Sequence, residues 1–188
     1  MLAGLFYLEY ICVSNTNSDT MTIKRIIALA AILAAVCSCG ILSDQVSPEE
    51  EALIHQRLDA QSFKVDIQFM NPRRGPQQAL TTPYAVTVSN GMLASALPYI
   101  GEAWDLPYGG GKGFTFEAPI IEYVQKLAAF GGARIIEAKV DNEEEILLYH
   151  FEIFPNGKTS LTVRSQHRET IDYRGNLDPY TDPAEKKK

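Results

Sequence analysis

Apolar and polar residues alternate with a period of two over most of the chain beyond residue 60. Phe63, Val65, Ile67 and Phe69, for example, are separated by single, mostly polar residues. This spacing places the apolar side chains on one face of a strand, which is typical of a half-buried β-strand. The same pattern predicts further strands at Tyr84–Val88, Met92–Leu97, Phe114–Phe116, Tyr123–Leu127, Ile136–Val140, Leu147–Ile153, Leu161–Val163 and Thr170–Tyr173.

Short turn sequences separate many of these runs. Asn90-Gly91 favours a short hairpin, because both central residues of a type I′ turn need positive φ, and Asn156-Gly157 marks another turn. Gly131-Gly132 and Asp141-Asn142 mark two more turns, and the acids Glu143–Glu145 after the second are interpreted as a solvated hairpin end. Sequential hairpins predict a mainly β fold, an antiparallel meander of about eight or nine strands that closes into a lipocalin-like barrel. The alternative is an α+β fold, in which a helix packs on an open antiparallel sheet.

A helical signal precedes the first strand. Ser47 can cap a helix, Pro48 suits the first helical position, and the acids Glu49–Glu51 favour the positive end of the helix dipole. We therefore expect a short helix from Ser47 to about Ala60.

Residues 21–40, MTIKRIIALAAILAAVCSCG, have the pattern of a bacterial lipoprotein signal. A basic pair precedes an apolar run that is too short to cross a hydrocarbon core about 30 Å thick. We expect residues 21–38 to be removed and Cys39 to become the lipidated first residue. The alternative is an ordinary secretory signal that is cleaved within Ala34–Ser38.

These features divide the chain into segments. Residues 1–20 contain no basic residue, so we interpret them as an extension from a misassigned start codon. Residues 39–46 form the lipidated cysteine and a linker, residues 47–176 a single β-rich domain, and residues 177–188 a polar, flexible tail. No Asp follows Cys39, as in signals for the outer membrane, so we expect an outer-membrane location in the cell envelope.

Charge and cysteine content exclude several functions. The formal net charge is −6, and no basic stripe is present, which argues against a nucleic-acid partner. The three cysteines, Cys12, Cys37 and Cys39, all precede the predicted domain. That domain therefore has no disulfide, no thiolate nucleophile and no zinc site of the cysteine type.

One long connection, Leu97–Gly113, departs from the strand pattern. Its sequence LPYIGEAWDLPYGGGKG is rich in glycine and contains the single tryptophan of the chain. Tyr99, Trp104 and Tyr108 are the candidate ligand-binding residues, because their rings can form a platform for a sugar, peptide or lipid. The favoured interpretation is that these rings pack over one end of the sheet.

Three segments carry a resemblance to a known family: YAVTVSNGMLASA, LPYIGEAWDLPYGGGKGFTFEAP and TSLTVRSQHRETIDYRG. Together they resemble the uncharacterised lipoprotein family called domain of unknown function 4251, found mainly in Bacteroidota, over Glu50–Gly175. The resemblance implies an envelope lipoprotein with a mostly β domain. It implies no activity, because the family has no established catalytic or binding residues. Trp104 differs from the tyrosine expected there.

The histidines are His55, His150 and His167, and no pair has the spacing of a helical zinc site. The sequence predicts a lipid-anchored, non-catalytic binding or structural module without cofactor or metal. Its expected partners are the membrane, through the lipid, and an unidentified envelope ligand or protein. The alternative is an envelope hydrolase, in which His150 or His167 works with a carboxylate such as Glu152 or Asp172.

Overall fold

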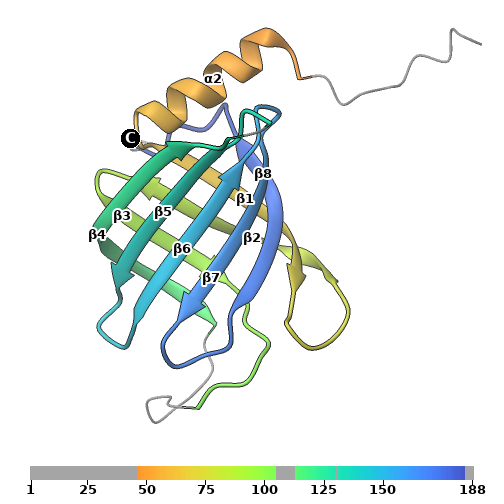
Figure 1. The fold of residues 1–188 in the computed structure, drawn as a ribbon, viewed down its shortest axis with the longest axis vertical. Coiled ribbons are helices and arrows are strands. Elements are labelled where there is room, and N and C mark those ends of the chain that lie inside the picture. Colours follow the sequence, from red (N-terminus) through yellow and green to blue (C-terminus); the bar gives the residue numbers. More distant parts are fainter. Residues whose placement is uncertain (1–45, 105–112, 130, 185–188) are drawn as a thin grey trace, which may run out of the picture. The chain divides into compact units, whose positions relative to one another are not determined.

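The computed structural model describes residues 46–104, 113–129 and 131–184 of the chain. These residues form one helix and eight strands (Figure 1). The elements are α2 (Pro48–Asp59), β1 (Phe63–Asn71), β2 (Gln78–Ser89), β3 (Met92–Leu97), β4 (Phe114–Leu127), β5 (Arg134–Asp141), β6 (Ile146–Ile153), β7 (Lys158–Ser165) and β8 (Ile171–Asp178). Residues 1–38, Cys39 and Tyr108 lie outside the described residues, and what the sequence predicts for them stays a prediction.

The strands form a closed antiparallel barrel in sequence order, because β8 pairs back with β1. Val65, for example, is the register partner of Val86 on β2 and of Leu177 on β8. The predicted meander and barrel are confirmed, and the open-sheet alternative is wrong. Because the barrel is closed, no strand lacks a partner on one side over its whole length.

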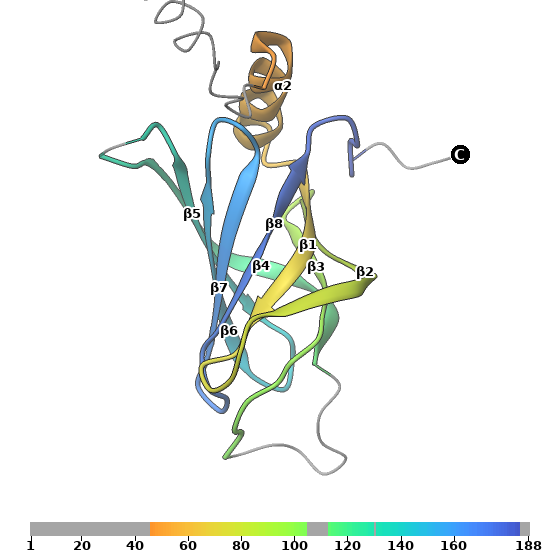
Figure 2. The same ribbon diagram turned by 90° about the vertical axis from the view of Figure 1, so that its right-hand side faces the viewer.

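The strand count is eight because two predicted strands, Phe114–Phe116 and Tyr123–Leu127, are the two halves of β4. The first half pairs with β3 up to Pro119, and the second half pairs with β5 from Ile120 onward. The register shifts between Ile120 and Glu122, which bends the strand. Figures 1 and 2 show the second half running in a different direction from the strands behind it.

The predicted helix is confirmed. The Ser47 hydroxyl accepts a hydrogen bond from the Glu50 amide at 3.2 Å, which satisfies one donor of the first turn. Ile54 and Leu58 are buried in the core, and α2 lies across one end of the barrel (Figure 1). In the described part of the chain, no helix is long and apolar enough to span a membrane.

Large side chains fill the barrel interior. Phe63 meets Phe151 edge to face, with ring centroids 5.7 Å apart. Two buried tyrosines satisfy their hydroxyls: Tyr149 donates to the Ser95 hydroxyl at 2.9 Å, and Tyr173 donates to the carbonyl of Pro98 at 2.6 Å. An eight-stranded barrel is just wide enough for side chains to fill it.

Two local predictions need correction. Phe69 is 36% exposed and Met70 is buried, because the register shifts between Ile67 and Phe69 and reverses the alternation there. The ordered chain also extends past Asn176: β8 continues to Asp178, and Asp182 pairs with Arg57 of α2.

Candidate functional site

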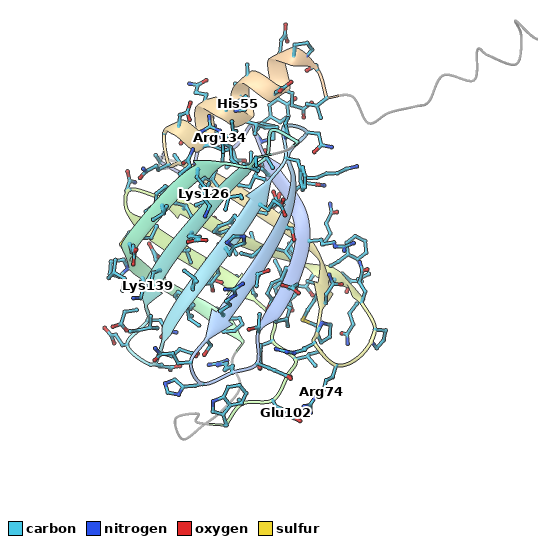
Figure 3. All side chains as sticks on the ribbon, in the orientation of Figure 1. His55, Arg74, Glu102, Lys126, Arg134 and Lys139 are labelled. Atoms are coloured by element: carbon cyan, nitrogen blue, oxygen red, sulfur yellow. The ribbon has the colours of Figure 1, made fainter. Side chains whose placement is uncertain are left out.

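Tyr99 and Trp104, the two predicted aromatic residues that the structure describes, lie at the barrel end opposite α2. Tyr99 is engaged in packing: its ring meets Phe114 edge to face at 5.3 Å, and its hydroxyl donates to the Glu102 carbonyl at 2.7 Å. The Glu169 carbonyl also lies 3.3 Å from this hydroxyl. Figure 3 shows Glu102 beside Arg74 at this end, where the two side chains form an ion pair. Tyr99 therefore attaches the connection to the barrel.

Trp104 differs from Tyr99 in exposure. Its indole N–H donates to the Gln166 carbonyl at 3.1 Å, and its amide donates to the His167 carbonyl at 3.1 Å. The residue is nevertheless 64% exposed. The structure thus brings Tyr99 and Trp104 to the same end of the barrel, with only Trp104 presenting a ring to solvent. Because Tyr108 is outside the described residues, the aromatic platform stays a prediction.

A buried ion pair lies beneath this connection. The Arg168 and Glu145 side chains are 5% and 3% exposed, and Arg168 Nε lies 2.8 Å from a Glu145 carboxylate oxygen. Ser165 donates to the other carboxylate oxygen. The guanidinium also lies over the rings of Tyr99 and Phe114, at 5.5 and 5.1 Å from their centroids. One charged side chain thus joins the β7–β8 turn, the β5–β6 turn and the β3–β4 connection.

The sequence interpretation of this glutamate needs correction. Glu143–Glu145 reads as a solvated hairpin end, yet the Glu145 side chain points inward. The Asn142 side chain accepts hydrogen bonds from the amides of Glu144 and Glu145, which turns the chain directly into β6. Every second residue of β6 is buried, including Leu147 and Tyr149. Continuing this alternation two residues toward the N-terminus places Glu145 on the inner face.

The histidines are separate from one another. His150 Nδ1 lies 3.2 Å from a Glu137 carboxylate oxygen on the outer wall, rather than beside Glu152 or Asp172. Asp172 instead accepts a hydrogen bond from the Thr162 hydroxyl at 2.6 Å. His55 lies 3.8 Å from Glu51 on α2, and His167 lies in the β7–β8 turn. Within residues 46–104, 113–129 and 131–184, no group of three or more potential ligands could hold a metal ion.

The bulge in β1 builds a pocket on the outer wall. Because the register shifts there, the consecutive side chains of Gln68 and Phe69 are both exposed. Gly175 on β8 makes this approach of the strands possible: a Cβ at that position would lie 2.0 Å from the Asp66 carbonyl oxygen. Bulges are frequent beside binding sites, where they redirect a side chain. Sequence alternation does not reveal such an extra residue.

This bulge pocket has a volume of about 490 Å³. It is lined by Gln68, Phe69, Gln77, Glu152, Phe154, Lys158, Thr159, Ser160, Arg174, Gly175 and Asn176. Phe69 and Phe154 are each more than a third exposed, so both rings are open to a ligand. Arg174 forms no hydrogen bond or ion pair with any described residue. A guanidinium with five N–H donors therefore shares this pocket with two aromatic rings, amides and hydroxyls.

Comparison with protein families matches residues 45–177 to DUF4251, a domain of unknown function. The chain belongs to the DUF4251 family. The crystal structure of a DUF4251 family protein from Bacteroides eggerthii DSM 20697 has a similar fold, with a TM-score of 0.55 at 15% identity. The alignment covers 72% of this chain and 91% of that chain. A comparison with curated proteins gave no significant match.

Membership in the DUF4251 family confirms the resemblance that the three sequence segments carry. At 15% identity, the Bacteroides structure supports the barrel architecture and nothing about a ligand. The matched range ends at residue 177, within β8, and so covers the bulge pocket, the buried ion pair and the exposed Trp104. Function in this DUF4251 protein must therefore be argued from its own side chains.

Proposed function

We propose that this protein is a lipid-anchored, non-catalytic binding module of the outer membrane, which holds a small acidic ligand in the bulge pocket. The observation that carries the proposal is Arg174, a guanidinium without a partner among the described residues in a pocket of about 490 Å³. Ligand pockets of about 300–1,000 Å³ with a few convergent polar groups are typical of small-molecule sites.

The lining residues indicate the class of ligand. Arg174 and Lys158 favour a carboxylate, because a cation–carboxylate hydrogen bond is stronger than a neutral one. The amides of Gln68 and Asn176 can bind hydroxyl groups, and the exposed ring of Phe69 offers an apolar face. A sugar acid uses all three features at once. The carboxylate of Glu152, which also lines the pocket, disfavours a ligand with a second negative charge close to it.

The outer-wall histidine supports the alternative hydrolase less well. His150 contacts Glu137, but it lines neither the bulge pocket nor the second outer-wall pocket of about 410 Å³. Thr162, the register partner of His150, donates its hydroxyl hydrogen to Asp172 instead of to the imidazole. A general base needs to lie within hydrogen-bond reach of the group that it deprotonates. A binding role is therefore the better account of the geometry.

The test is calorimetric titration of the full chain in detergent with glucuronic acid and N-acetylmuramic acid, with neutral glucose for comparison. We expect an acid to bind and glucose not to. Arg174→Ala should weaken binding by about tenfold or more, since a hydrogen bond to a charged group contributes about 1.5–3 kcal/mol. Phe69→Ala should weaken it as well.

The matched control is Arg164→Ala, which removes an exposed arginine of the neighbouring strand β7 that does not line the bulge pocket. It should leave affinity unchanged. Equal affinity in the wild type and the Arg174→Ala variant, or equal losses in both arginine variants, would refute the bulge pocket as the binding site. Circular dichroism of each variant confirms that the barrel is retained.

A further inference from the structure

The second half of β4 has a strand partner on only one of its two sides. Along Glu122–Leu127, the strand pairs with β5, and Ile121 lies at the register shift just before it. The β3 strand pairs only with the first half of β4, as far as Pro119. The last backbone hydrogen bond on the β3 side among the described residues runs from the Ile120 amide to the Gly91 carbonyl at 2.9 Å. Beyond it, no backbone hydrogen bond to another described residue is found on that side. The barrel is closed, yet it carries this short free edge.

The free edge is unusually apolar for a solvated strand. Ile121, Val124 and Leu127 are 55%, 43% and 65% exposed, three of the eight exposed large hydrophobic residues in the described part of the chain. An exposed edge of this kind is a template for pairing with another strand unless something covers it. Glu122 lies among these residues and has no ion-pair partner among the described residues of its own chain.

The order of residues along this edge identifies the partner. The segment reads Ile-Glu-Tyr-Val-Gln-Lys-Leu from 121 to 127. Placed antiparallel to itself about Val124, it sets Glu122 opposite Lys126, and Lys126 opposite Glu122. The same arrangement sets apolar Ile121 opposite apolar Leu127 at both ends. Opposite charges and apolar pairs directly across two strands are stabilising.

We propose that Ile121–Leu127 pairs with the same segment of a second copy of this chain, in an antiparallel twofold dimer centred on Val124. A twofold interface must be self-complementary, and this segment is so in both charge and apolarity. Figure 3 shows Lys126 on the outer wall, where its amine lies 3.8 Å from Glu137. The second copy's Glu122 adds a second carboxylate to the same amine.

The register follows from these pairs. A shift by two residues in either direction sets Lys126 opposite Val124 or Ile120, and both ion pairs are lost. A shift by one residue would pair residues whose side chains lie on opposite faces of the sheet, because side chains alternate along a strand. Only pairing centred on Val124 keeps both ion pairs. The dimer does not involve the bulge pocket, so the two proposals can fail independently.

The test is disulfide cross-linking of the full chain in the membrane, in a parent variant with Cys12 and Cys37 changed to serine. Val124→Cys places two thiols opposite each other, where Cα atoms are about 4.5–5.5 Å apart, within the range that a disulfide spans. The matched control Glu122→Cys lies on the same face of the strand. Its two copies would be about 14 Å apart along the strands, which is too far to link.

We expect a reducible dimer with Val124→Cys and none with Glu122→Cys or the parent. Co-expression of Glu122→Cys with Lys126→Cys should restore a cross-link between the two chains. Equal cross-linking at positions 122 and 124, or none above the parent, would overturn the proposal. So would a covalent adduct of Val124→Cys with a different protein instead of a second copy.

Charge reversal provides a measurement without cysteines. Sedimentation velocity of the full chain in detergent should show a dimer that Glu122→Lys weakens by about tenfold, since both ion pairs become repulsive. Adding Lys126→Glu to Glu122→Lys restores opposite charges and should restore the dimer. An unchanged dimer in the single variant, or a double variant weaker than the single one, would contradict this register.

Discussion

At the scale of single residues, the buried ion pair of Arg168 and Glu145 is stable only when both side chains are present. The two side chains are almost fully buried, and Arg168 Nη1 also donates to the Gly113 carbonyl at 3.2 Å. A buried pair of this kind adds little net stability compared with apolar residues, but removing one member leaves an uncompensated charge. We therefore interpret the pair as a device that positions the β3–β4 connection.

Arg168→Met should lower the free energy of unfolding by about 3–5 kcal/mol, because Glu145 would remain buried and unpaired. Urea unfolding followed by circular dichroism measures this change. The matched control Arg164→Met removes an exposed arginine and should alter stability by about 0.5 kcal/mol or less. Combining Arg168→Met with Glu145→Leu should recover part of the loss. A loss below about 1 kcal/mol would mean that water reaches this pair.

The buried tyrosines predict a loss of stability in alkaline solution. Burial raises the pKa values of Tyr149 and Tyr173 far above the ordinary value of about 10, and burial raises the pKa of Tyr123 to about 12. Because the folded state holds these protons more tightly than the unfolded state, the stabilisation is complete below about pH 10. It is lost as the pH rises from about 10 towards the folded values.

Urea unfolding at increasing pH, with tyrosinate absorbance recorded in parallel, measures this dependence. Ionisation of the buried tyrosines should coincide with loss of β-sheet signal. A Tyr149→Phe/Tyr173→Phe variant should lose less stability between neutral and alkaline pH than the wild type does. Ionisation of all tyrosines before any unfolding would show that the barrel interior is open to solvent.

At the scale of elements, alternation predicted the strands and the capping residues predicted the helix, whereas alternation failed where the backbone adds a residue. The turn at Asn90-Gly91 lies where its sequence indicates, with positive φ at both residues, because this conformation is a local property. The turn at Asn156-Gly157 also lies where predicted, but only Gly157 has positive φ there. The β1 bulge depends on a distant residue, Gly175, which makes room for it. The continuity of β4 depends on two different partners. Neither relation can be inferred from local periodicity.

The same limit applies to the candidate site. Aromatic composition predicts Tyr99 and Trp104 as candidate binding residues. It does not show that the Tyr99 hydroxyl donates to backbone carbonyls. The bulge pocket is assembled from β1, β6, β7 and β8, whose outward residues look like an ordinary solvated face in the sequence. Arg174 becomes a candidate only when its lack of a partner among the described residues is known.

Gly175→Ala should destabilise the barrel by about 1–3 kcal/mol, because the added Cβ would meet the Asp66 carbonyl oxygen at 2.0 Å. Thermal unfolding measures the effect, and the matched control is Asn176→Ala on the exposed face of the same strand. The variant should also disturb the bulge pocket and reduce ligand affinity. Equal melting temperatures for the two variants would show that β1 can move away from β8 without cost.

At the scale of the whole molecule, the chain combines a closed β-barrel with a lipid anchor that the sequence predicts. Large side chains occupy the described interior, and the proposed binding site lies on the outer wall. The free edge of β4 and the bulge pocket lie on different strands, which allows a dimer to keep both pockets available. Lipidation at Cys39 would hold such a dimer at the membrane by two sets of acyl chains.

The most direct test of this account is native mass spectrometry of the full chain released in detergent from its own envelope, for the wild type and the Arg174→Ala variant. We predict a chain that begins at Cys39 with acyl groups attached, and a small acidic ligand that is retained by the wild type and lost from Arg174→Ala. An unacylated N-terminus would contradict the anchor. Identical ligand-free masses for both proteins would contradict binding in the bulge pocket.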